Sequence, residues 1–106
     1  MDRVYSMLGL AMKAGKLRCG GFLAEEAIRS GEAAMVILAQ DAKKNTFKTI
    51  RDKCSYYDVP CHIYGTKDGI GRAVGRGEIA CAAVTDEGFA GSIRRLLPAD
   101  PCNAQQ

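Results

Sequence analysis

The residues best suited to chemistry in this chain are glycines and cations that lie close together in two segments. Residues 69–77 read GIGRAVGRG, and residues 13–21 read KAGKLRCGG. Glycine lets a backbone approach a partner closely, and the forked donors of arginine suit phosphates and guanine edges. Two such segments favour the binding of RNA. We expect them to form the two halves of a clamp, one around residues 16–22 and the other around residues 69–77.

The other reactive residues do not indicate an enzyme. His62 follows Cys61, but neighbours on a strand point to opposite faces and cannot form a catalytic pair. Asp86 and Glu87 stand at an expected helix start, where they favour the helix dipole. The glycine spacing in residues 69–77 places the third glycine one residue late for a dinucleotide-binding fingerprint. We therefore expect a non-catalytic protein without a cofactor.

The cysteines are interpreted as reduced thiols. The chain has five cysteines and no CxxC pair. A metal site formed by Cys54, Cys61, His62 and Cys81 is conceivable, but its spacing fits no zinc pattern, and we expect no metal. The N-terminus lacks the apolar core of a signal peptide, and no apolar stretch approaches membrane-spanning length. We expect a cytoplasmic protein without a membrane partner.

Charge is distributed unevenly along the chain, although the net charge is only +3. The cations form three clusters: Lys13, Lys16 and Arg18; Lys43, Lys44, Lys48, Arg51 and Lys53; and Arg72 and Arg76. The acids lie mainly elsewhere, at Glu25, Glu26, Glu32, Asp86 and Glu87. A divided surface of this kind suits an anionic partner, and the alternative is a face that is merely solvated.

Hydrophobic periodicity predicts helices that alternate with strands. The expected strands cover residues 17–19, 34–39, 61–64 and 79–84. The apolar faces of the expected helices are Val4, Met7, Leu8 and Ala11; Leu23, Ala24, Ala27 and Ile28; Phe47, Ile50, Cys54 and Tyr57; Ile70, Ala73 and Val74; and Phe89, Ile93, Leu96 and Leu97. The expected caps are Asp41 or Asn45 for the third helix, Asp68 for the fourth and Asp86 for the fifth.

These elements predict an α/β fold, a three-layer α/β/α sandwich with a roughly four-stranded mixed sheet that is at least partly parallel. At 106 residues the chain is one domain. We place that domain at residues 1–98. Pro98 and Pro101 end the pattern, so residues 99–106 are expected to form a flexible tail.

The order of several short motifs resembles a known family. The motifs are MVILAQDA at residues 35–42, Val59-Pro60 and IGRAVG at residues 70–75. Together they resemble the kink-turn RNA-binding ribosomal proteins of the L7Ae and L30e type. AVTDEGFA at residues 83–90 is similar to the short bacterial YlxQ-like branch of that family. The resemblance extends from about Leu8 to Leu97.

The resemblance implies a sandwich that holds a sharply bent RNA. The loop and helix start after the first strand would contact sheared G·A pairs, and a second loop before the last strand would cover a flipped-out base. By position, Gly20 is the motif glycine, and the residues that follow it at contact positions are Gly21, Phe22, Leu23 and Glu26. The covering loop corresponds to Arg76, Gly77 and Glu78.

Three of these positions depart from the family pattern. Characterised members have polar residues where this chain has Phe22 and Leu23, and a lysine where it has Glu26. An acid at Glu26 would repel a phosphate, and apolar residues at a helix start suit a protein interface.

The sequence thus predicts a non-catalytic, ribosomal-protein-like protein that binds structured RNA, kink-turn-like or ribosomal, with the ribosome as a further partner and a monomeric state. The alternative is a protein-interaction module of the same fold that has lost kink-turn recognition and acts in a translation-related complex. The expected RNA-contacting residues are Lys13, Lys16, Arg18, Gly20, Gly21, Phe22, Arg29, Lys43, Lys44, Arg72, Arg76, Gly77 and Glu78.

Overall fold

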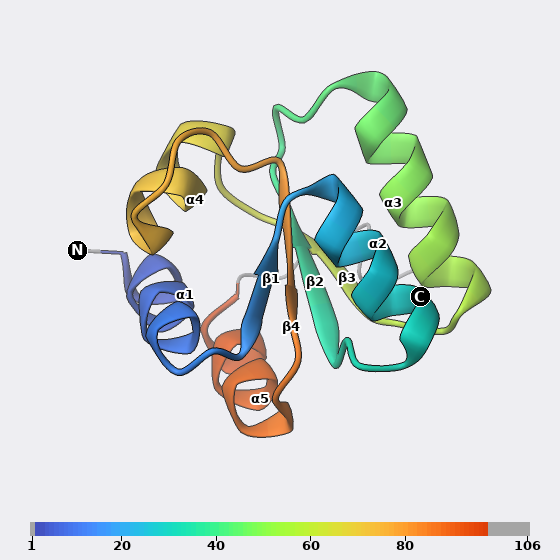
Figure 1. The fold of residues 1–106 in the computed structure, drawn as a ribbon. Helices are drawn as coiled ribbons and strands as arrows, with labels where there is room; N and C mark the ends of the chain where they lie inside the picture. The colour runs from blue at the N-terminus through green and yellow to red at the C-terminus, as the bar shows by residue number, and fades with distance from the viewer. Residues whose placement is uncertain (1, 98–106) are drawn as a thin grey trace.

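A computed structural model describes residues 2–97, and within them helices and strands alternate along the chain (Figure 1). The expected tail over residues 99–106 lies outside the described residues. The elements are α1 (Arg3–Lys13), β1 (Leu17–Cys19), α2 (Gly21–Ser30), β2 (Met35–Leu38), α3 (Lys44–Tyr56), β3 (Cys61–Ile63), α4 (Lys67–Val74), β4 (Cys81–Val84) and α5 (Glu87–Leu96). No helix in this part of the chain is both long and apolar enough to cross a membrane.

The strands form a mixed four-stranded sheet in the order β1-β4-β2-β3. Strand β4 pairs antiparallel with β1 on one side and with β2 on the other, while β2 and β3 are parallel. Strands β1, β2 and β3 therefore run in one direction and end at the same edge of the sheet, where β4 begins. The predicted mixed sheet is confirmed.

Helices cover both faces of this sheet. Helices α1, α4 and α5 pack on one face, and α2 and α3 on the other (Figure 1). Strands β2 and β4 lie in the middle of the sheet and are buried along their whole length, as their continuous apolar runs predict. The three-layer α/β/α sandwich expected from the sequence is confirmed.

Two of the predicted helix caps are wrong, and one is confirmed. Asp86 caps α5, since its carboxylate accepts the N–H of Phe89 at 2.9 Å. Helix α4 is capped by Thr66 and not by Asp68, because Thr66 is the last residue with extended backbone and its hydroxyl accepts the N–H of Gly69 at 3.0 Å. Asp68 is the second residue of α4, so its backbone is already helical and it does not occupy the N-cap position.

Helix α3 begins without either predicted cap. Its N-cap residue is Lys43, which makes no side-chain capping bond. Asn45 is already inside the helix. Asp41 lies too far upstream, and its carboxylate instead accepts the backbone N–H of Lys67 at 2.8 Å. Asp41 thus joins the loop before α3 to the start of α4.

Two residues expected on apolar faces are exposed. Tyr57 is 39% exposed because it is the C-cap residue of α3, where the backbone leaves the helical conformation and the helical period no longer places the side chain. Leu23 is 42% exposed, since it lies in the first turn of α2 at the margin of the apolar stripe formed by Ala24, Ala27 and Ile28.

Candidate nucleic-acid interface

Four connecting segments meet at the edge of the sheet where β1, β2 and β3 end. Backbone hydrogen bonds join them: the N–H of Gly20 donates to the carbonyl of Cys81 at 2.9 Å, and the N–H of Gln40 to the carbonyl of Gly65 at 2.8 Å. We call this edge the loop edge and define it as residues 20–23, 40–44, 65–67 and 75–80. It brings together the two loops that the sequence predicted to contact RNA.

Helices α2 and α3 both begin at the loop edge, and no side chain caps either of them. Neither helix has an acidic residue in its first turn. Their first-turn N–H groups and the positive ends of their helix dipoles are therefore not neutralised by a cap or by an acid of the same first turn. The other three helices have side-chain caps, namely Asp2, Thr66 and Asp86.

Cations add to this positive edge. Lys43 and Lys44 are exposed at the start of α3, a place where a cation disfavours the helix and an anionic partner would relieve that cost. Arg76 is exposed in the loop between α4 and β4. Burial raises the pKa of the Cys19 thiol at the end of β1, and the nearby Arg76 guanidinium acts in the opposite direction. The charge of Arg76 therefore lies close to the end of β1.

Lys67 is a member of the loop edge that the sequence did not reveal. Its ammonium lies 3.9 Å from the carboxylate of Glu78 and its side chain is mostly covered. In the sequence it stands directly before the expected cap Asp68, outside the expected helix and outside the basic clusters. The bond from its N–H to Asp41 and the ion pair with Glu78 depend on segments far apart in the chain.

The glycines in this region fall into two groups. A Cβ built on Gly71 would overlap the carbonyl oxygen of Gly77, and one built on Gly69 would overlap the hydroxyl of Tyr5, so these glycines permit packing inside the protein. A Cβ on Gly20 or Gly77, in contrast, would meet no atom within 4 Å. Of these four glycines, only Gly20 and Gly77 leave room for an outside partner. Within residues 69–77 we therefore limit the expected RNA contact to the part around Gly77.

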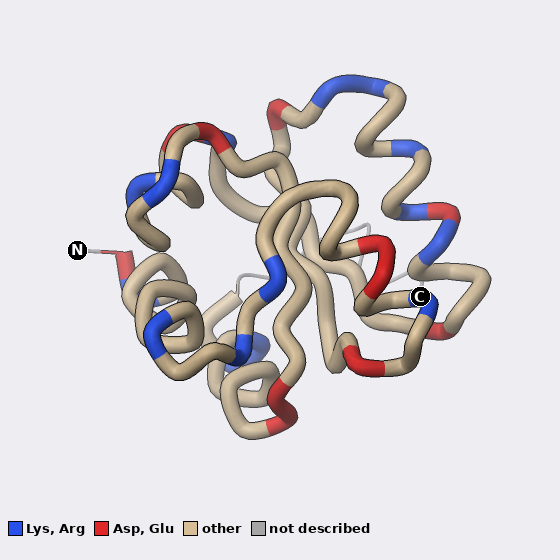
Figure 2. The backbone as a smooth tube through the Cα atoms, viewed as in Figure 1, with Lys and Arg blue, Asp and Glu red and all other residues tan. Residues whose placement is uncertain are grey.

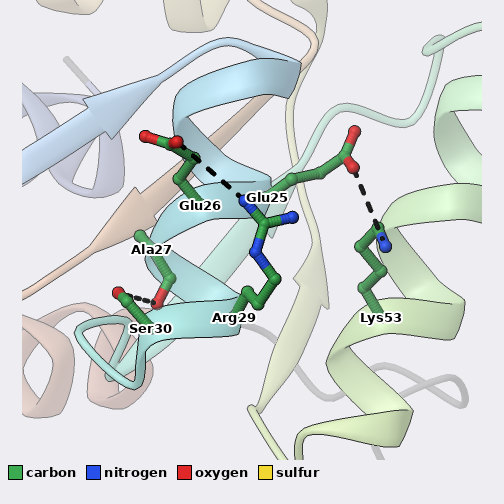
Figure 3. A network of polar contacts seen from close by, with 6 residues as sticks. All are labelled: Glu25, Glu26, Ala27, Arg29, Ser30 and Lys53. Carbon is green, nitrogen blue, oxygen red and sulfur yellow. Dashed lines mark hydrogen bonds and ion pairs between the residues drawn. The ribbon is translucent and has the colours of Figure 1, made fainter.

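Apolar and acidic side chains also occupy the start of α2. Phe22 is 73% exposed. Glu26 is exposed and lies 3.9 Å from Arg29 on the same helix, and Glu25 turns toward α3, where it lies 3.9 Å from Lys53 (Figure 3). The positive loop edge is thus bordered on the α2 side by carboxylates that are partly compensated by cations of the same face.

Several predicted contact residues lie away from the loop edge. Lys16 is at the other end of β1, where its carbonyl accepts the N–H of Thr85 at 2.9 Å, and Lys13 is at the end of α1. The guanidinium of Arg18 donates back to the carbonyl of Gly15 at 3.1 Å, and Arg29 is in the last turn of α2. Of the expected clamp between residues 16–22 and residues 69–77, only residues 20–22 and 75–77 therefore belong to the loop edge.

Arg72 lies in a groove away from the loop edge. Its guanidinium lies 3.1 Å from the carboxylate of Asp68, and both residues line a groove of about 750 Å³ between α1 and α4. Gly9 and Ala73 also line this groove, and the two helices approach closely there. Arg72 thus faces the α1–α4 side and not the loops.

The cysteines within residues 2–97 lie apart from any cluster of candidate metal ligands. Within residues 2–97 no group of three or more His, Cys, Asp or Glu side chains is arranged to hold a metal ion. Cys54, Cys61 and Cys81 are buried in the core beneath α2 and α3 and form no disulfide. Burial raises the pKa of Cys81 to about 12, and a hydrogen bond with Cys61 together with burial raises the pKa of Cys54. Burial thus favours the neutral thiol at Cys54 and Cys81, and the thiolate is the form that reacts or binds metal.

The sequence profile of the ribosomal protein L7Ae/L30e/S12e/Gadd45 family matches residues 2–93. The chain belongs to this family. Membership in the L7Ae/L30e/S12e/Gadd45 family confirms the resemblance inferred from the order of the motifs, and it accounts for the mixed sheet with helices on both faces.

Two curated relatives cover nearly the whole chain. The chain is 40% identical over 93 residues to the RNA-binding protein YlxQ of Bacillus subtilis (strain 168), a match that covers 88% of this chain and 93% of the relative. It is 37% identical over 96 residues to the RNA-binding protein YlxQ of Enterococcus faecium, with 91% and 92% covered.

Two solved structures share the fold. A protein of unknown function from Bacillus halodurans C is 34% identical and superposes with a TM-score of 0.86, covering 91% of this chain and 97% of that one. The 15.5kD RNA binding protein of Giardia lamblia superposes with a TM-score of 0.72 at 18% identity, covering 87% and 79%. At that identity the second structure supports the fold alone.

Proposed function

We propose that this protein is a non-catalytic RNA-binding protein of the ribosomal-protein type and that the loop edge is its RNA interface. The observation that carries the proposal is the gathering, at one edge, of two uncapped helix N-termini with Lys43, Lys44 and Arg76. The curated YlxQ relatives, which are named RNA-binding proteins, support the same assignment.

The edge offers the groups that RNA recognition needs. Backbone N–H groups at the starts of α2 and α3 can donate to phosphates or to exposed base edges, and the cations can contact the backbone. Gly20 has φ of 92°, a conformation that favours glycine, and its open Cα allows RNA to approach the start of α2.

The RNA that fits this edge is a structured one, a kink-turn or a comparable bend in ribosomal RNA. Its irregular shape exposes base edges and unstacked bases that an edge of loops can contact, whereas a regular RNA helix hides its base edges in a deep, narrow groove. By the family resemblance, Arg76, Gly77 and Glu78 correspond to the loop that would cover an extruded base.

The proposal is tested by binding measurements with three RNAs. These are a kink-turn RNA, the same RNA with its G·A pairs replaced, and a fragment of ribosomal RNA. We expect binding to at least one structured RNA at moderate salt, with a loss on replacement of the G·A pairs if the kink-turn itself is recognised. Absence of binding to all three would refute RNA binding.

Phe22 supports a second candidate function, a protein-interaction module of the same fold. Phe22 is 73% exposed within the loop edge, and Leu23 next to it in the chain is 42% exposed. Apolar side chains at such a place suit a protein partner better than a phosphate. A pull-down from lysate with and without RNase separates the two functions: RNase-resistant capture that depends on Phe22 favours the protein partner.

A further inference from the structure

A stripe of cations runs down α3 from the loop edge. Lys44, Lys48 and Arg51 are spaced by four and three residues, so they lie on one face of the helix. Lys44 and Lys48 are exposed, and Arg51 is partly exposed. Figure 2 shows that Lys and Arg occur along the whole length of α3. We call Lys44, Lys48 and Arg51 the α3 stripe.

Lys44 and Lys48 keep their charges accessible at the surface. The acid on α3 is Asp52, whose carboxylate lies 2.8 Å from the Lys48 ammonium, but both side chains are highly exposed, at 79% and 65%. Such an exposed pair stabilises a protein little and is easily exchanged for another anion. The Arg51 guanidinium is 5.9 Å from the centre of the Phe47 ring, which holds it along the helix surface.

The stripe is distinct from the contact between α2 and α3. Lys53 lies on another side of α3, where it engages Glu25 of α2 (Figure 3). The stripe is instead continuous with Lys43 and Lys44 at the loop edge. The exposed aromatic residue of α3, Tyr56, lies at the far end of the helix from the loop edge. Three cations on one helix face that continues this edge favour a polyanion as the partner.

We infer that the α3 stripe binds the phosphate backbone of an RNA stem that flanks the element held at the loop edge. This inference rests on the proposed function. Lys44 and Arg51 are about 10 Å apart along the helix axis. Over that length, one strand of a nucleic-acid duplex presents about three phosphates. The stripe therefore matches a backbone that continues past the loop edge, and it adds affinity that does not depend on RNA sequence.

The inference is tested with two RNAs that share the same core. One ends at the core, and the other carries a stem longer by about 20 Å, the length of α3. The test variant is Lys48→Gln/Arg51→Gln. The matched control is Arg94→Gln/Arg95→Gln, which removes the same charge from exposed positions of α5 on the opposite face of the sheet. Affinity is measured by fluorescence anisotropy at several salt concentrations.

We expect the stripe variant to lose about tenfold in affinity for the long RNA, to lower its salt slope by about two, and to bind the short RNA unchanged. The control variant should bind both RNAs as the unaltered protein does. A Lys48→Arg/Arg51→Lys variant, which keeps both charges, should restore binding to the long RNA and so exclude a folding defect.

Other results would overturn the inference. Equal binding of the long RNA by the stripe variant and the unaltered protein would do so, and so would equal losses in the stripe and control variants. RNase-resistant capture of an acidic protein through the stripe would assign this face to a different partner. If an Arg76→Ala variant lowers the affinity for both RNAs and the stripe variant lowers neither affinity, the further inference fails while the proposed function stands. If the unaltered protein binds neither RNA, the proposed function fails as well.

Discussion

Residues of the same type have different roles in this protein according to where they lie. Gly71 and Gly77 belong to the same short segment, yet Gly71 is buried against the carbonyl of Gly77 while Gly77 itself faces open space. Lys16 and Arg76 are both exposed cations in glycine-rich loops, but they lie at opposite ends of β1. These pairs allow matched experiments.

The first prediction concerns the two glycines. Gly71→Ala would force a methyl group into the backbone of the following loop, and we expect it to lower the free energy of unfolding by about 2 kcal/mol or more. Gly77→Ala should change it by less than about 0.5 kcal/mol and should instead weaken RNA binding at the covering loop. Urea denaturation of both variants checks this. Equal stability of the two would contradict the packing described here.

The second prediction concerns the two cations. Arg76→Ala should weaken RNA binding and reduce the salt slope by about one, because it removes one phosphate contact at the loop edge. Lys16→Ala removes the same charge from the opposite end of the strand and should leave both quantities unchanged. Anisotropy titrations over a range of salt measure both. A loss with Lys16→Ala as large as with Arg76→Ala would show that the binding surface is not confined to the loop edge.

At the scale of elements, the caps determine how each helix starts and which backbone N–H donors remain available to a partner at that end. Thr66 closes the start of α4 with its hydroxyl, although α4 also begins at the loop edge. Helices α2 and α3 have no such closure and leave donors for a partner. A helix start without a cap is less stable on its own. Because its donors are unsatisfied, the free energy gained when it binds an anion is larger.

The third prediction tests the observed cap against the one expected from the sequence. Thr66→Ala should lower the free energy of unfolding by about 1 kcal/mol, since it removes the acceptor for the N–H of Gly69. Asp68→Ala removes only an exposed pair with Arg72 and a favourable charge near the helix start, and it should cost about half as much or less. Thermal denaturation compares the two. A larger cost for Asp68→Ala would show that Thr66 is not the effective cap.

At the scale of the whole molecule, the sheet determines both the core and the interface. Strand β4 lies between β1 and β2 and runs opposite to both, so the loop that precedes it returns to the edge where β1 ends. The same packing buries Cys81, the first residue of β4, between its neighbouring strands.

The fourth prediction follows from that burial. Because the pKa of Cys81 is raised to about 12 in the folded protein, the folded state favours the neutral thiol. The stability that this thiol contributes is complete below its ordinary pKa near 9 and is lost as the pH rises from about 9 towards 12. The free energy of unfolding should therefore fall faster over this range in the unaltered protein than in Cys81→Ala. Parallel pH profiles of the two proteins would contradict a buried, protonated thiol.

The elements of the fold could be predicted from the sequence because they depend on local patterns. Apolar runs of four to six residues, helical periodicity and glycines at the helix ends located all the helices and strands to within a few residues. The contact positions after Gly20 and at residues 76–78 came from the family resemblance, which depends on the order of motifs along the chain.

Only the tertiary structure decided which of the candidate residues share a surface. Whether Lys16 lies beside Gly20 or a strand length away, and whether Gly71 faces a ligand or its own loop, depends on strand direction and on segments distant in the chain. Local sequence contains no information on such distances. The glycine-rich and basic segments were therefore visible from the sequence, while their division between the packed core and the loop edge was set by how β4 pairs with its neighbours.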